Sequence, residues 1–229
     1  ISFRDTGCPF YLISLLPMVV LYLLADLLFV LAFYLLRYRR TVVSENLSRA
    51  FPGMSDKERK ILEKNFYQHF CDLMVEILKG FSISEKEIKK RIRVKNLDLI
   101  VDYYQKNRNI ILYAAHHGNW EWMLHGATTA FDVPIDPVYK PLHNKTVDVL
   151  IYDIRSQFGS RPLSMEESTR DILRRRREFR LFVMVADQSP IRSERGYWTE
   201  FMNQEACFYL GSEIIAKMTR FPVLFAQCH

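Results

Sequence analysis

The sequence is poor in cysteine, and the few cysteines it has lie far apart. Cys8, Cys71, Cys207 and Cys228 form no Cys-x-x-Cys pair and no dense framework. A zinc ribbon or a disulfide-stapled domain needs closely spaced cysteines, so the sequence excludes both classes. Scattered thiols of this kind are typical of a protein in a reducing compartment.

The chain also lacks a motif that would link its basic charge to nucleic acid. Its 32 Lys and Arg exceed its 26 Asp and Glu, and the net charge of +6 favours nucleic acid, phospholipid headgroups or an acidic carrier protein as partner. The basic runs at residues 89–95 and 174–177 have no recognition motif or stacking platform beside them, so we expect no nucleic-acid partner. We interpret both runs as solvated helix faces, with membrane phosphates or an acidic carrier as the alternative.

The features of a cleaved signal peptide are missing as well. The apolar run over residues 11–36 is too long, and no small-residue cleavage site follows it. Only Ser14 and Asp26 are clearly hydrophilic within the run, and its length of about 26 residues suffices to cross a bilayer core of roughly 30 Å. We therefore predict that residues 1–40 form a membrane anchor.

Two residues disfavour a single straight helix across the membrane. Pro17 would kink such a helix, and the carboxylate of Asp26 is costly inside a bilayer. Two short helices or a re-entrant segment are alternatives to one span, and a buried hairpin of core helices is the alternative without a membrane.

The charges beside the apolar run predict its orientation. Arg37, Arg39 and Arg40 follow the run directly, whereas Arg4 on the other flank is offset by Asp5. Because positive charge is retained on the cytoplasmic side, we expect the following domain to face the cytoplasm.

A helical segment follows the predicted anchor. Residues 55–58 read Ser-Asp-Lys-Glu, which is the spacing of a capping box, and apolar residues then recur at helical intervals up to Gly80. This pattern predicts an amphipathic helix of about 24 residues.

From residue 98 onward the pattern is that of an α/β domain. With 229 residues, 49% of them hydrophobic, the chain is long enough for one sizeable domain and a short attached segment. The apolar runs at 110–115 and 181–186 are continuous rather than alternating, as in strands covered on both faces. The predicted fold is α/β, a mostly parallel sheet flanked by helices, with an N-terminal hydrophobic membrane-anchoring helical segment. We expect helices at 98–107, 120–130, 144–158, 167–177 and 208–219, and strands at 109–115, 134–139, 180–186 and 222–227.

Polar side chains follow the predicted strands. Because the carboxyl ends of parallel strands meet at one edge of a sheet, where ligands bind, we expect these side chains to converge. They are His116, His117, Lys140, Asp187, Gln188 and His229.

The spacing around the first strand leaves two candidates for a general base. His117 and Glu121 are four residues apart and would share a helix face, whereas His116 and Glu121 would point roughly 140° apart on a regular helix. His116 can be the base only on a turn, which Gly118 would permit. In either case the carboxylate would orient the imidazole and stabilise the imidazolium.

A metal site is the weaker interpretation of the same residues. His117, Glu121 and His125 recur at helical intervals, but the pattern is not His-Glu-x-x-His and no further ligand is evident. We therefore expect no metal.

Residues 116–121 read His-His-Gly-Asn-Trp-Glu, and residues 186–190 read Ala-Asp-Gln-Ser-Pro. With these motifs the chain resembles the lipid A biosynthesis (lauroyl/myristoyl) acyltransferases, within the wider lysophospholipid acyltransferase superfamily. Residues 116–121 carry the superfamily's His-x4-Asp/Glu signature. The resemblance covers nearly the whole chain. Further similar positions are residues 38–40, 46–47, 50–52 and 66–67, together with Asp72 and Glu76.

The resemblance implies an acyl transfer without a covalent acyl-enzyme. It makes His116 the general base and Glu121 its partner. His116 would activate a hydroxyl of a membrane glycolipid, which attacks the thioester of an acyl carrier protein or acyl-CoA, and no other cofactor is implied. The sequence does not identify the donors that stabilise the oxyanion.

The resemblance also implies substrate-binding roles for Asn119, Lys140, Asp187 and Gln188. The family commonly has arginine in a Tyr-Arg-Pro pattern, where this chain has lysine at 140. Lysine keeps the charge but loses the bidentate fork, so Lys140 is either a phosphate ligand or an ordinary residue at a strand end. For Asp187 the alternative is a loop-capping aspartate.

Together these observations predict a membrane-anchored O-acyltransferase that adds a secondary acyl chain to an anionic lipid A precursor. It would act on the cytoplasmic face of a Gram-negative inner membrane. A lysophospholipid or another lipid is the alternative acceptor, and a catalytically silent membrane-associated protein that binds lipid or carrier is the alternative from another class. Residues 41–229 would form the acyltransferase domain. Family members continue for some tens of residues beyond the last predicted strand, so we expect a C-terminal truncation.

Overall fold

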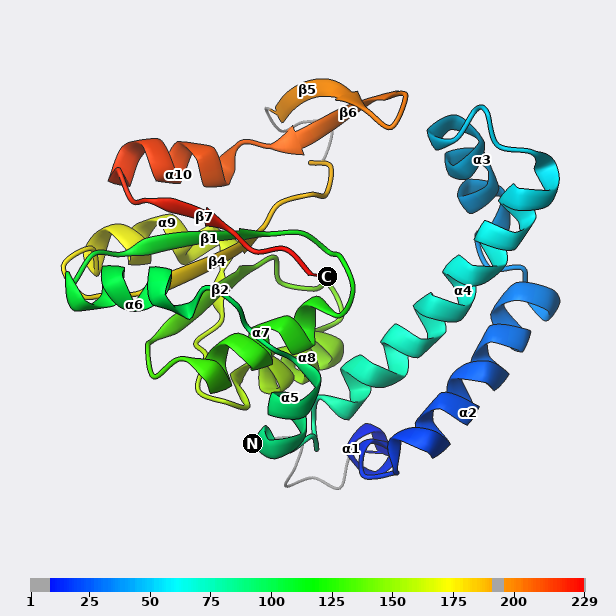
Figure 1. Ribbon diagram of the computed structural model, residues 1–229, viewed down its shortest axis with the longest axis horizontal. Helices are drawn as coiled ribbons and strands as arrows, with labels where there is room; N and C mark the ends of the chain where they lie inside the picture. The colour runs from blue at the N-terminus through cyan, green and yellow to red at the C-terminus, as the bar shows by residue number, and fades with distance from the viewer. Residues whose placement is uncertain (1–8, 191–195, 229) are drawn as a thin grey trace.

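The computed structural model describes residues 9–190 and 196–228, and a five-stranded parallel sheet forms its centre (Figure 1). The strand order is β3-β2-β4-β1-β7. This arrangement confirms the predicted α/β fold. The described residues do not include Arg4 and Asp5, which precede the apolar run, nor Cys8 and His229. The strands are β1 (Ile110–Ala114), β2 (Ile135–Tyr139), β3 (Leu163–Ser164), β4 (Leu181–Val185) and β7 (Val223–Phe225).

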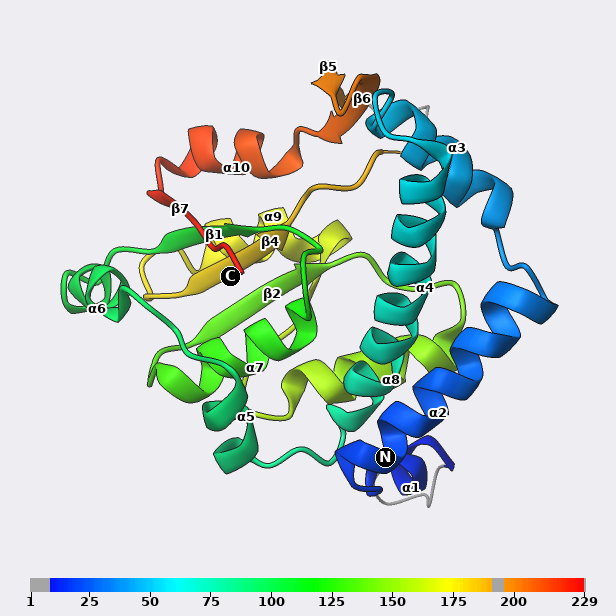
Figure 2. The ribbon, with the colours of Figure 1, turned by 45° about the vertical axis from the view of Figure 1, so that its right-hand side comes forward.

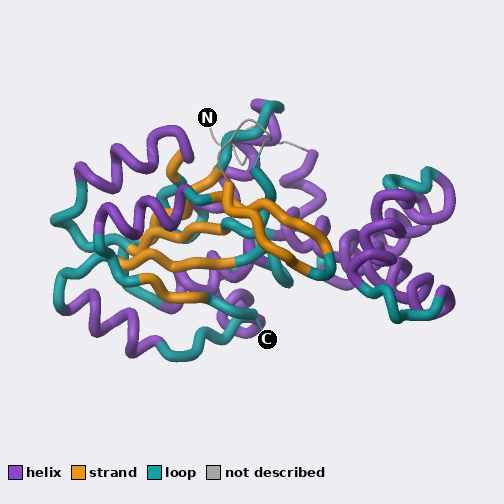
Figure 3. The backbone as a smooth tube through the Cα atoms, turned by 90° about the horizontal axis from the view of Figure 1, so that it is seen from above, coloured by secondary structure: helices purple, strands orange, loops and turns teal. Residues whose placement is uncertain are grey.

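Helices cover both faces of the sheet, which appears as one layer between them in Figure 3. Consecutive side chains of a strand point to opposite faces. Ile110 packs with α6 and α7, whereas Ile111 packs with α9 and α10, and both side chains are fully buried. Two covered faces explain why the strand sequences are continuously apolar. The helices are α6 (Leu97–Gln105), α7 (Trp120–Ala130), α8 (Lys145–Ser156), α9 (Met165–Arg174) and α10 (Gly211–Thr219).

One predicted helix is partly wrong. The sequence pattern predicts a helix from residue 208, but residues 204–209 form a strand and the helix begins at Gly211. The strand β6 (Gln204–Tyr209) pairs with β5 (Gly196–Phe201) in an antiparallel hairpin. Met202 and Asn203 have φ angles of 52° and 59°, as a two-residue hairpin turn requires, which is why the chain reverses there.

The N-terminal region forms a unit of packed helices beside the sheet (Figures 1 and 2). The break predicted at Pro17 is present between α1 and α2, and the capping box of Ser55 and Glu58 is present at the start of α4. The elements are α1 (Pro9–Ser14), α2 (Met18–Val30), a π-helical turn (Leu31–Leu35), α3 (Arg40–Ala50) and α4 (Asp56–Lys79).

The helix α2 buries one face and exposes the other. Leu21, Ala25 and Phe29, spaced by four, pack against α4 in a cluster that includes Tyr67 and Cys71. The opposite face carries apolar side chains that remain exposed. Val19, Leu23, Leu27 and Val30 are among them.

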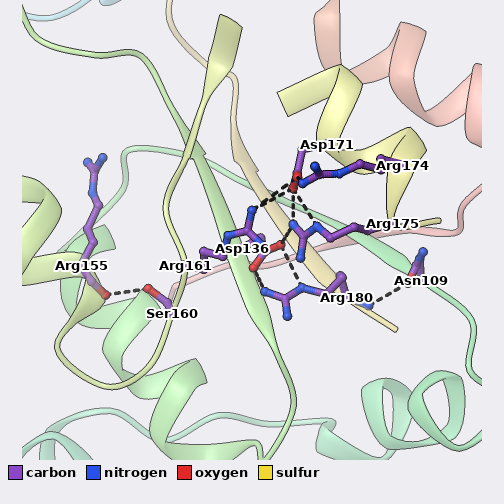
Figure 4. A network of polar contacts seen from close by, with 9 residues as sticks. All are labelled: Asn109, Asp136, Arg155, Ser160, Arg161, Asp171, Arg174, Arg175 and Arg180. Carbon is purple, nitrogen blue, oxygen red and sulfur yellow. Dashed lines mark hydrogen bonds and ion pairs between the residues drawn. The ribbon is translucent and has the colours of Figure 1, made fainter. Parts of the chain in front are cut away.

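A buried ion-pair network joins α9 to the sheet at the end opposite the strand carboxyl ends (Figure 4). Arg175 donates to Asp136 at 2.6 Å and to Asp171 at 2.9 Å, and Arg180 also donates to Asp136. The interpretation of residues 174–177 as a solvated face is therefore wrong for Arg175, because burial of Asp136 requires compensating charge.

The basic run at residues 89–95 agrees better with its interpretation as a solvated helix face. It begins within the short helix α5 (Glu85–Arg91), where Lys89 pairs with Glu85 and Arg91 with Glu87. The side chains of Lys89 and Glu85 are more than half exposed. This part of the run is a solvated helix face.

Candidate active site

The centre of the site is a contact between the ends of two neighbouring strands. β1 and β4 pair in parallel with Ala114 opposite Val185, so His116 and Asp187 each lie two residues beyond that last pair. His116 Nδ1 is 2.6 Å from Asp187 Oδ1, and the His116 backbone N–H donates to Asp187 Oδ2 at 2.9 Å. Asp187 therefore fixes both the backbone and the ring of His116.

His116 lies on a turn and not on a helix. Gly118 has a φ of +60°, a backbone conformation that residues other than glycine rarely adopt. The helix α7 begins only at Trp120. The ring of Trp120 packs edge-on against the imidazole, with 4.8 Å between centroids. His116 Nε2 makes no hydrogen bond to any described residue, so this nitrogen is available to a substrate.

Glu121 has a different partner from the one that the family resemblance implies. It lies in the first turn of α7, is 3% exposed, and accepts from Arg155 of α8 in a bidentate contact of 2.6 and 2.9 Å. The Trp120 indole also donates to it at 3.1 Å. The structure thus pairs His116 with Asp187 and Glu121 with Arg155, because strand order brings β4, not α7, to the imidazole.

Arg155 is the site residue that the sequence reasoning missed. Burial alone would lower the pKa of its guanidinium, but the hydrogen bonds and charge of Glu121 outweigh burial and raise that pKa above its usual value. Its guanidinium lies over the ring of Tyr139, 5.6 Å from the centroid, and its carbonyl accepts from Ser160, which Figure 4 shows. Its only signal in the sequence is its position directly after the apolar Ile154, a pattern too common to single it out.

A cavity of about 880 Å³ lies beside these groups. Apolar side chains of α4, α7 and the strands form most of its wall, and Phe66, Phe70, Leu73, Leu112, Leu124 and Val183 are among them. Polar side chains gather on the remaining wall. The charged, imidazole and amide side chains among them are His69, His116, His117, Glu121, Lys140, His143, Asp148, Arg155 and Gln188.

The predicted substrate residues fall into two groups. Lys140 and Gln188 are exposed and line the cavity at the carboxyl ends of β2 and β4. The carboxylate of Asp187 is paired with the imidazole of His116. Asn119 caps α7, since its Oδ1 accepts from the Trp122 N–H at 2.9 Å, and its amide donates to Glu76 at 2.8 Å.

The three residues of the alternative metal interpretation do not converge. His125 is fully buried and its ring nitrogens have no hydrogen-bond partner in the described residues, whereas His117 is exposed. Within residues 9–190 and 196–228, no group of three or more His, Cys, Asp or Glu side chains is arranged to hold a metal ion.

The chain matches one family over nearly its whole length. A model of the family described as bacterial lipid A biosynthesis acyltransferase matches residues 9–229. The chain is also similar to lipid A biosynthesis acyltransferase 2 of Shigella flexneri, with 24% identity over 161 residues. That match covers 69% of this chain and 50% of the relative, so the chain spans about half the length of the curated relative.

Proposed function

The chain belongs to the bacterial lipid A biosynthesis acyltransferase family, and we propose that it transfers a fatty acyl chain from a thioester to a hydroxyl of a lipid A precursor. The observation that carries this proposal is the His116–Asp187 pair, whose 2.6 Å contact leaves Nε2 free at the wall of a largely apolar cavity. A general base beside an apolar cavity is what acyl transfer to a hydroxyl needs.

In the proposed reaction His116 Nε2 takes the proton of the acceptor hydroxyl. The hydroxyl oxygen then forms a bond to the thioester carbonyl carbon, the C–S bond breaks, and the leaving thiolate takes the proton back from the imidazolium. Asp187 stabilises that imidazolium and holds the tautomer with Nδ1 protonated. Glu121 and Arg155 line the same cavity, and Arg155 supplies positive charge for the developing oxyanion.

The cavity also suits the two substrates. Its apolar wall, formed by residues such as Phe70, Leu73 and Val183, would hold an acyl chain. Lys140 is exposed at the rim and has no ion-pair partner in the described residues, so it is free to contact a phosphate of an anionic glycolipid. Gln188 would add a neutral donor and acceptor beside it.

A membrane surface is the proposed location. The helix Met18–Leu35 is long and apolar enough to cross a membrane, and only 22% of it is buried. The exposed leucines of α2 have no cover in the described structure, and lipid is the chemistry that would cover them. With Arg37, Arg39 and Arg40 beyond its end, the domain would face the cytoplasm at the inner membrane.

The donor in this proposal is an acyl thioester, carried by an acyl carrier protein or by coenzyme A. The excess of basic residues suits both, because an acidic carrier and the phosphates of coenzyme A are anionic. No further cofactor enters the reaction.

The test of the proposed function is mass spectrometry of lipid A from cells that lack the full-length protein and from the same cells after the gene is restored. We expect restoration to add the mass of one acyl chain to lipid A. An identical lipid A mass in both cells, with a change in another lipid, would assign the enzyme a different acceptor. No acyl change in any lipid would reject acyl transfer.

A further inference from the structure

Glu76 of α4 joins three parts of the molecule. Its Oε1 accepts from the hydroxyl of Tyr22 on α2 at 2.8 Å, and its Oε2 accepts from the amide of Asn119 at 2.8 Å. Its backbone carbonyl accepts from the Trp122 indole at 3.0 Å. One half-buried side chain thus contacts the apolar helix α2 and the start of α7.

Asn119 is the point where this contact reaches the site. It lies between His116 and Glu121 in the chain, and it caps α7 through its side chain and through its carbonyl, which accepts from the Met123 N–H at 2.9 Å. Rotation of the Asn119 side chain would therefore loosen the first turn of α7, which carries Glu121.

Glu76 connects the unit of α2 and α4 to the part of the molecule that carries the site. The unit of α2 and α4 stands beside the sheet, and α4 approaches α7 and α8 near its C-terminal end, where Glu76 lies (Figures 1 and 2). Hydrogen bonds to a carboxylate are stronger than those between neutral groups, so Glu76 is a stiff connection between the two parts.

We propose that Glu76 is a positioning residue that links α2, through Tyr22, to the capping residue Asn119 and so holds Glu121 and His116 in their catalytic arrangement. The proposal rests on the proposed function for the identity of the site. It makes catalysis dependent on the placement of α2, the helix with the exposed apolar face.

The neighbouring Asp72 provides a matched control. It lies one turn earlier on α4, is also half-buried, and makes no hydrogen bond to any described residue. Asp72→Asn removes the same charge from the same helix as Glu76→Gln, but Asp72 makes no hydrogen bond to Tyr22 or Asn119. A role of Glu76 in charge or packing alone would give the two variants the same behaviour.

The experiment compares Glu76→Gln, Tyr22→Phe, their combination and Asp72→Asn in the full-length protein in detergent micelles. We measure kcat and KM for acyl transfer to a lipid A precursor, and hydrogen exchange of the peptide covering residues 115–123. We expect Glu76→Gln to lower kcat by about tenfold or more with KM changed by less than about twofold, and to speed exchange in that peptide. Tyr22→Phe changes both quantities in the same direction by less, and adds nothing to Glu76→Gln.

These measurements distinguish a failure of the positioning role of Glu76 from a failure of the proposed function. Equal kcat and equal exchange in Glu76→Gln and Asp72→Asn would overturn the positioning role. If the wild-type protein transfers no acyl chain to lipid A while Glu76→Gln still speeds exchange, the proposed function fails and the connection stands. Should Glu76→Gln not fold, Tyr22→Phe decides, because loss of one hydroxyl leaves the packing of α2 intact; unchanged kcat and exchange would then overturn the proposal.

Discussion

The imidazole of His116 lies 2.6 Å from the carboxylate of Asp187, although 71 residues separate them in the chain. The parallel register of β1 and β4 produces this contact, since both residues follow the ends of paired strands. The same carboxylate accepts from the His116 backbone N–H, so the ring and its turn are fixed together. His116 is thereby oriented without any contribution from Glu121.

The first prediction concerns Asp187. Asp187→Asn keeps the side-chain shape but favours the wrong imidazole tautomer, so we expect kcat for acyl transfer to fall on the order of 10²- to 10⁴-fold. The neighbouring Ser189→Ala is the control, and its kcat stays within about twofold of the wild type. Steady-state kinetics with a lipid A precursor measures both. Wild-type kcat in Asp187→Asn would contradict the role of Asp187.

The second prediction concerns the buried pair of Glu121 and Arg155. Arg155→Met leaves the Glu121 carboxylate buried without its partner, and we expect a loss of about 3–5 kcal/mol in the free energy of unfolding. Glu121→Gln combined with Arg155→Met removes the stranded charge and recovers part of that loss. Denaturant unfolding of both single variants and the double variant gives the coupling. Additive losses would mean that the pair does not interact in solution.

The third prediction concerns pH and His125. Burial lowers the pKa of His125 to about 4 from its ordinary 6.5, with the charge of Glu121 opposing the shift. Because the unfolded chain binds this proton first as the pH falls, stability is retained above pH 6.5 and lost between about 6.5 and 4. From pH 7.5 to pH 5 we expect His125 to account for about 2 kcal/mol of lost stability.

The check for His125 is denaturant unfolding at both pH values. His125→Leu removes the titrating group at similar volume, and its free energy of unfolding should fall less with pH than that of the wild type. The exposed His143→Leu is the control and keeps the wild-type pH dependence. Equal pH dependence in His125→Leu and the wild type would contradict the burial of a neutral imidazole.

The fourth prediction concerns the exposed face of α2. Leu23 is 63% exposed and Leu27 is 64% exposed, so Leu23→Glu with Leu27→Glu leaves the packing on α4 untouched. We expect binding to anionic phospholipid vesicles to weaken by at least about tenfold, because charge on a lipid-facing surface is costly. Vesicle sedimentation measures it, with Glu45→Gln on α3 as the control. Unchanged binding would show that this face does not contact lipid.

The sequence was sufficient to predict four of the five strands of the central sheet, but not the short strand β3 or the hairpin. Continuous apolar runs such as 110–115 indicate strands covered on both sides, and the structure has them. The hairpin of β5 and β6 has exposed side chains such as Trp198 and a turn at Met202 and Asn203. Its turn lacks the Asn-Gly or Asp-Gly signal by which two-residue hairpins are usually found.

The sequence predicted several residues of the candidate site, but it did not predict which of them contact one another. Sequence reasoning placed His116 and Asp187 at the same edge of the sheet, because each follows an apolar run. Which strand lies beside β1 depends on strand order, which local patterns do not encode, and so the contact between the two residues was not foreseen. Arg155 lies on a helix, where one charged residue after a buried apolar residue is too common a pattern to single out.

The central claim is that His116 is the base of an acyl transfer, and its most direct measurement is the rate of labelled acyl transfer to a lipid A precursor by His116→Ala. His117→Ala, the exposed neighbour, is the control. We expect the rate of His116→Ala to fall by about 10²- to 10⁴-fold while vesicle binding persists, and the rate of His117→Ala to stay within about threefold of the wild type. Undiminished transfer by His116→Ala would contradict the account.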